Sequence, residues 1–148
     1  MIKRLLIAIT VITSIISCSK DDKDNILCEV GPVGISLEII NSDNENILLK
    51  EELAKNQIHI TDIDNDKEIT DFIITENGYL EFFLGFQTAE FNYKIKLDNT
   101  NNNNFIIHIN TKRSTGKNGC SSTSITDVSV DNAEITNNEF TLYTLKVE

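Results

Sequence analysis

Apolar and polar residues alternate along most of the chain beyond residue 30, and a period of two is typical of half-buried β-strands. The stretch Glu90–Leu97 shows the alternation clearly, because its aromatic and aliphatic residues fall on one side and Asn92, Lys94 and Lys96 on the other. The pattern predicts about eight short strands. They are expected at Ile35–Ile40, Gln57–Asp62, Ile69–Thr75, Tyr79–Leu84, Glu90–Leu97, Phe105–Lys112, Ser124–Val130 and Glu139–Val147.

Turn-forming residues separate these stretches at intervals of about 8–12 residues. The Asn77-Gly78 pair favours a tight hairpin, and the acidic segment Ile63–Glu68 predicts a second turn. Arg113–Gly119 is expected to be a loop, and Leu48–Lys55 is the only helix-like stretch. These features predict an all-β fold: an antiparallel β-sandwich, immunoglobulin-like or transthyretin-like, with at most one short helix.

The alternation also assigns side chains to faces. It changes phase between Leu142 and Tyr143, which indicates either a β-bulge or a strand covered on both faces. Tyr79 shares a face with Glu81 and Phe83, which makes it the candidate aromatic platform on which a glycan could stack. Core or half-buried packing is the favoured interpretation of Tyr79, and the platform is the alternative.

The first 17 residues differ in composition from the rest of the chain. Lys3 and Arg4 form a cationic start, and Leu5–Ile16 is an apolar run. Ser17 then places a small residue before Cys18. A signal peptide needs about 7–15 apolar residues and a membrane-spanning helix about 20. The run therefore predicts an export signal.

The segment Ile15-Ile16-Ser17-Cys18 resembles the lipobox of bacterial lipoproteins, in which the cysteine thiol takes a diacylglycerol and the leader is removed. The resemblance implies lipidation of Cys18, and two or more acyl chains anchor a protein firmly. Lys20, Asp21 and Asp22 follow in a polar tether that resembles the lipoprotein export signal of the Bacteroidota, which implies display on the outer face of the outer membrane. The expected parts of the chain are a signal peptide (1–17), a lipid-anchored tether (18–27) and a single β-sandwich domain (28–148).

The mature chain is strongly acidic. Removal of the leader takes Lys3 and Arg4 from the 13 basic residues, so 11 basic residues face 23 acidic ones and the net charge becomes about −12. A surface of this kind repels phosphate backbones, which excludes nucleic acid as a partner.

The three cysteines agree with lipidation of the first. If Cys18 carries acyl chains, Cys28 and Cys120 remain as an even pair. A disulfide between them suits an oxidising compartment and closes a loop of about 90 residues, which contributes roughly 4–5 kcal/mol in the chain-entropy model. Two buried free thiols are the alternative.

The order of motifs along most of the mature chain resembles small lipoproteins of the Bacteroidota. These proteins have a Cys-x-x-Gly-Pro segment before a strand, an Asn-x-Leu-Leu segment after an acidic turn, and a late cysteine before the last strands. The matching segments are Cys28–Pro32 for the first and Asn46–Leu49 for the second. Cys120 is the late cysteine, and Val130–Ala133 belongs to the strands that follow it. The resemblance carries no known activity, so it implies only a fold and a location.

The acidic segment Asp62–Asp66 has carboxylate or amide side chains at alternate positions, as a calcium loop does. An EF-hand loop also needs glycine at position six and glutamate at position twelve. Counted from Asp62, these positions hold Lys67 and Ile73. We therefore expect an acidic hairpin turn and no metal site.

Catalytic motifs are missing from the sequence. His59 and His108 fall on the polar sides of their strands, outside any HExxH or His/Cys zinc spacing, and there is no GxSxG element. The acidic residues cluster in turns, where solvation explains them. We expect no enzymatic activity and no cofactor. Two functions stay open: a surface-tethered module that binds an envelope protein or glycan, and an accessory or inhibitory subunit of an envelope complex.

Overall fold

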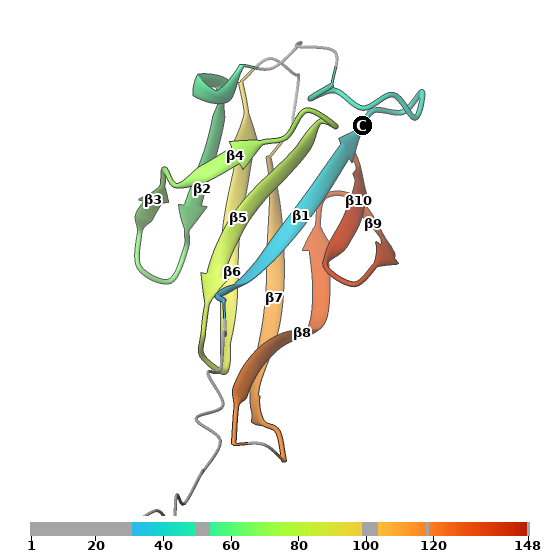
Figure 1. Ribbon diagram of the computed structural model, residues 1–148. Helices are drawn as coiled ribbons and strands as arrows, with labels where there is room; N and C mark the ends of the chain where they lie inside the picture. Colours follow the sequence, from blue (N-terminus) through green and yellow to red (C-terminus); the bar gives the residue numbers. More distant parts are fainter. Residues whose placement is uncertain (1–30, 50–53, 99–103, 118, 148) are drawn as a thin grey trace, which may run out of the picture.

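Two β-sheets pack face to face in the computed structural model, which describes residues 31–49, 54–98, 104–117 and 119–147 (Figure 1). The predicted all-β sandwich is confirmed. The predicted signal peptide and tether lie outside the described residues, and so do the site residues Cys18, Lys20, Asp21, Asp22 and Cys28.

The first sheet, called sheet A, has the strand order β4-β5-β1-β10-β9. Its strands are β1 (Val33–Ile40), β4 (Phe72–Ile74), β5 (Tyr79–Gly85), β9 (Glu134–Glu139) and β10 (Leu142–Lys146). The first and last strands, β1 and β10, pair in parallel, with Ser36 opposite Leu142. This pair departs from the predicted antiparallel arrangement. The β9–β10 hairpin reverses the chain shortly before its end, so that β10 runs in the same direction as β1.

The second sheet, sheet B, is antiparallel throughout and has the order β3-β2-β6-β7-β8. A single turn of 3-10 helix, η1, precedes β2, at the end of the predicted helix-like stretch. These elements are η1 (Lys55–Gln57), β2 (Ile58–Asp62), β3 (Lys67–Ile69), β6 (Ala89–Leu97), β7 (Asn104–Thr115) and β8 (Ser121–Asp131).

The described residues form ten strands, two more than the sequence predicted. The predicted strand Ile69–Thr75 is two strands, because β3 ends at Ile69 in sheet B and β4 begins at Phe72 in sheet A. The predicted loop Arg113–Gly119 is shorter, since its first three residues continue β7.

The inner faces of the two sheets form one hydrophobic core. Phe82 of sheet A meets Tyr93 of sheet B edge to face, with ring centroids 5.3 Å apart. Burial raises the pKa of Tyr93 to about 12, with a further contribution from the nearby Asp62 and Asp64. The largest fully buried side chains are Phe82, Phe105, Ile35, Leu37, Ile39, Ile60, Leu80, Ile95, Ile107, Ile109 and Leu145.

The phase change in the last strand is a β-bulge, since the pairing of β10 with β9 shifts register between Leu142 and Tyr143. The bulge turns Tyr143 and Leu145 into the core. The β-bulge, one of the two interpretations of the sequence pattern, is thereby confirmed.

Gly78 is required by the tight turn between β4 and β5. It has φ +73°, and an added Cβ would lie 2.8 Å from the Leu49 backbone nitrogen and 2.9 Å from Asn46 Oδ1. We expect Gly78→Ala to destabilise the domain by roughly 2–4 kcal/mol, because left-handed backbone strain adds to a steric clash. Gly119→Ala is the matched control, since Gly119 has a similar positive φ (+81°) and no heavy atom lies within 4 Å of the added Cβ. Urea unfolding of both variants measures the difference, and equal losses would show that the clash is unimportant.

Candidate functional site

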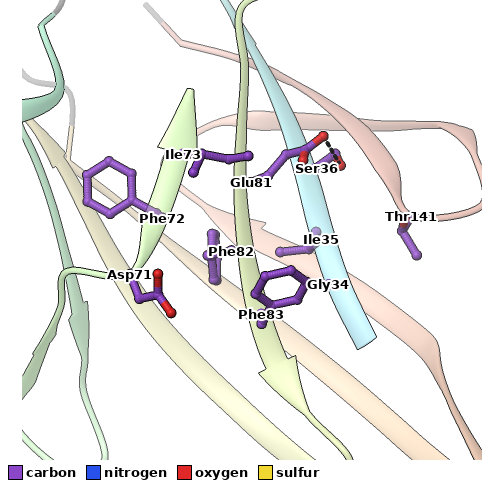
Figure 2. A pocket seen from close by; sticks show the side chains of 10 residues that line it. All are labelled: Gly34, Ile35, Ser36, Asp71, Phe72, Ile73, Glu81, Phe82, Phe83 and Thr141. Carbon is purple, nitrogen blue, oxygen red and sulfur yellow. Dashed lines mark hydrogen bonds between the residues drawn. The ribbon is translucent and has the colours of Figure 1, made fainter. Parts of the chain in front are cut away.

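A groove of about 220 Å³ lies on the outer face of sheet A, where β4, β5 and β1 run side by side (Figure 2). Alternation along the strands places the outward side chains there, while their neighbours point into the core. The outward residues that line it are Gly34, Ser36, Ile73, Glu81, Phe83 and Thr141.

Phe83 is the aromatic surface of this groove, and 66% of it is exposed to solvent. Its partner across the β1–β5 ladder is Gly34, which has no side chain to cover the ring. A Cβ on Gly34 would lie 3.3 Å from Phe83 Cδ1. The ring of Phe83 is therefore left open to a ligand (Figure 2).

Polar groups stand beside the ring. The Ser36 hydroxyl donates a hydrogen bond to Glu81 Oε1 over 3.0 Å, and the two residues are cross-strand partners (Figure 2). Thr141 and Asp71 contribute further oxygen atoms to the lining. An apolar ring next to a carboxylate and hydroxyl groups matches a ligand that has both an apolar face and hydrogen-bond donors.

Tyr79, the candidate platform residue, is half-buried at one end of the same face, which agrees with the favoured interpretation of its packing. Phe83, four residues further along β5, is the exposed aromatic side chain instead. Alternation alone placed both on one face. The signal that separates them is the register, which sets Phe83 opposite Gly34 and Tyr79 opposite Glu38.

Both histidines lie on the outer face of sheet B, away from the groove, as the alternation predicted. His59 Nε2 is 3.0 Å from Asp98 Oδ2, and its Nδ1 is 3.4 Å from Glu68 Oε1. His108 Nδ1 is 2.6 Å from Asn92 Oδ1, and its Nε2 is 3.3 Å from Asp131 Oδ2. Neither has a nucleophilic hydroxyl or thiol among these partners. Across the described ranges, no cluster of three or more His, Cys, Asp or Glu residues has the geometry to hold a metal ion.

The carboxylates around His59 change the pKa of its ring in a direction that can be measured. Hydrogen bonds to Asp98 and then Glu68 raise the pKa of His59 above its ordinary value of 6.5. Stability from the protonated ring is complete below the unfolded pKa and is lost as the pH rises through the folded pKa. We expect an NMR titration of His59 to have its midpoint above 6.5, and Asp98→Asn to lower that midpoint more than Glu68→Gln does. A midpoint unchanged in Asp98→Asn would contradict the assignment.

The acidic segment between β2 and β3 is a hairpin turn, as predicted. Asp62 Oδ1 accepts hydrogen bonds from the backbone nitrogens of Asp64 (3.0 Å) and Asn65 (3.2 Å). Asp62 Oδ2 accepts a third from the Asn65 side chain over 2.8 Å. These bonds fix the turn.

Cys120 lies at the turn between β7 and β8, where its backbone carbonyl accepts a hydrogen bond from Gly116 over 2.7 Å. Because Cys18 and Cys28 are both outside the described residues, the Cys28–Cys120 pairing stays a prediction.

No protein-family model, no curated protein and no solved structure matches this chain. Nothing in the described part of the chain is a helix with the length and hydropathy needed to cross a bilayer.

Proposed function

We propose that this protein is a lipid-anchored binding lipoprotein of the cell envelope, without catalytic activity, and that its ligand occupies the groove of sheet A. The observation that carries the proposal is the exposed Phe83 ring beside the Ser36–Glu81 pair. A ring held open by a glycine on the neighbouring strand exposes apolar surface that a ligand can cover.

The groove suits one unit of a longer ligand. Its volume of about 220 Å³ is below the 300–1,000 Å³ of pockets that enclose a drug-sized molecule. A sugar ring can stack on Phe83 while its hydroxyls donate to Glu81, which favours an envelope glycan over a protein. The outer membrane location, facing the exterior, is supported by the lipobox-like segment at Cys18 and the tether that contains Lys20, Asp21 and Asp22.

The test is site-specific photo-crosslinking in living cells. A photoreactive phenylalanine analogue replaces Phe83 in one variant and Leu49 in the other, where Leu49 is an exposed apolar residue (56%) away from the groove. We expect crosslinked products from position 83 alone, and their loss when Glu81→Gln is added. Products of equal yield from both positions, or none from position 83, would contradict the groove as the binding site.

The same experiment distinguishes the alternative, an accessory or inhibitory subunit. A subunit of an envelope complex yields one protein partner in stoichiometric amount, whereas a glycan yields a ladder of adducts that glycosidase treatment removes. Crosslinking to a single protein partner would show that the ligand of the groove is a protein and not a glycan.

A further inference from the structure

Three basic residues gather at one end of this acidic domain. Between Asp98 and Asp127 the chain has no Asp or Glu, yet it has Lys112, Arg113 and Lys117. All three are exposed. They lie on the hairpin of β7 and β8, which extends past the ends of the other strands in Figure 1.

An exposed aromatic side chain adjoins this hairpin. Phe86, in the turn between β5 and β6, is 46% exposed. Its carbonyl accepts a hydrogen bond from Thr123 Oγ1 over 2.7 Å, and the Arg113 backbone nitrogen donates to Thr88 Oγ1 over 2.8 Å. The turn is thereby fastened to the hairpin. Phe86, Lys112, Arg113 and Lys117 are called the basic pole here.

The basic pole is also the end at which the described chain begins. Val33, the first residue of β1, pairs with Gly85, which immediately precedes Phe86. Twelve residues (19–30) separate Cys18 from Gly31, and they span at most about 40 Å. An anchor at Cys18 therefore keeps the start of β1, and the basic pole beside it, within reach of the membrane surface.

We propose that the basic pole docks on the bilayer surface through anionic headgroups, with Phe86 at the interface. This inference rests on the proposed lipid anchor. The positive charge of the pole in a mature chain of net charge about −12 orients the domain, because an anionic surface attracts this end and repels the rest. Aromatic rings are favoured at the boundary between headgroups and acyl chains.

Docking leaves the groove of sheet A beside the membrane rather than far above it. Phe83, in the groove, is two residues before Gly85 at the end of β5. The ligand class that fits this placement is a glycan close to the lipid surface, such as the saccharide of a glycolipid.

The test uses the complete lipidated protein in vesicles, with one tryptophan as a reporter, since the chain contains none. Phe86→Trp marks the basic pole. Leu49→Trp marks the opposite end, since Leu49 lies against the β4–β5 turn at Gly78. Vesicles contain lipids brominated near the headgroup, with phosphatidylcholine alone or mixed with phosphatidylglycerol.

We expect quenching of Phe86→Trp fluorescence in the anionic vesicles, at least twice that of Leu49→Trp, and its loss at 0.5 M salt. Replacing Lys112, Arg113 and Lys117 by Gln should abolish it, because each basic residue near an anionic surface contributes about fivefold to binding. Gln at Lys67, Lys94 and Lys146 is the control of equal charge change, and it should leave quenching intact.

Flotation of the protein with phosphatidylcholine vesicles reports the anchor separately. A protein that floats but shows equal quenching at positions 86 and 49, or none at either, has an anchor and no docked pole, and it overturns the inference. Failure to float would overturn the lipid anchor, on which the inference rests. Quenching that persists in the Lys112/Arg113/Lys117 variant would also overturn the inference that the basic pole docks on the membrane.

Discussion

Cys18→Ala is expected to release the protein completely from the membrane fraction. Every acyl chain in the proposed anchor is attached through this residue, by its thiol or by the amino terminus that cleavage creates. Each buried methylene contributes about 0.8 kcal/mol, so removal of two or more chains eliminates the membrane affinity. Labelling with an alkyne fatty acid, followed by fractionation, measures both events. A Cys18→Ala protein that still carries label and sediments with membranes would rule out the lipoprotein interpretation.

The tether provides a control that separates anchoring from display. Replacing Lys20, Asp21 and Asp22 together by alanine leaves Cys18 intact, so we expect unchanged labelling and sedimentation. If the tether is the export signal that it resembles, this variant stays on the inner side of the outer membrane. Protease added to intact cells should then cleave the unchanged protein and spare the variant. Equal cleavage of the two proteins would show that the tether does not direct display.

Loss of the predicted Cys28–Cys120 disulfide has the second large expected effect. Cys120 and the start of β1 lie at the same end of the sandwich: Val33 pairs with Gly85, and the neighbouring Phe86 accepts a hydrogen bond from Thr123. Cys28 precedes Val33 by only five residues (33 minus 28). We expect Cys28→Ser and Cys120→Ser each to destabilise the domain by about 2–5 kcal/mol, which lowers the melting temperature by roughly 8–20 °C.

The double variant is the control for this prediction. If both cysteines form one bond, Cys28→Ser/Cys120→Ser is little less stable than either single variant, because the second substitution removes nothing further. Additive losses would show that the two cysteines stabilise the domain independently. Thiol counting under denaturing, non-reducing conditions gives a direct check, and two free thiols in the exported protein would rule out the bond.

Strands with regular alternation and a well-filled core face could be predicted from the sequence. Two strand predictions were wrong for physical reasons: Ile69–Thr75 forms two strands, and β9 was not predicted. Ile69–Thr75 was predicted as one strand, but the chain leaves sheet B after Ile69 and joins sheet A at Phe72. No local pattern encodes a change of sheet. Strand β9 (Glu134–Glu139) has one aliphatic residue, Ile135, because it is an edge strand that covers little of the core.

The groove shows the same division between local and non-local information. The outward orientation of Glu81 and Phe83 follows from alternation along one strand. The exposure of Phe83 depends on Gly34 in another strand, about fifty residues away in sequence, and on the register that pairs them. The partners of the histidines, such as Asn92 for His108, also come from neighbouring strands. Single-strand patterns therefore place the candidate side chains on a face but do not assemble the site.

The parallel pairing of β1 with β10 determines when the sandwich can close. β1 is the central strand of sheet A, and one of its two edges is covered by β10, which begins only at Leu142. Ser36 can pair with Leu142 only after 106 further residues (142 minus 36) have been synthesised, and pairs so distant in sequence form slowly. A chain in which β10 has not yet emerged during synthesis therefore keeps an open edge on β1. A chain truncated before Leu142 keeps that edge permanently, and unpaired edges of this kind promote aggregation.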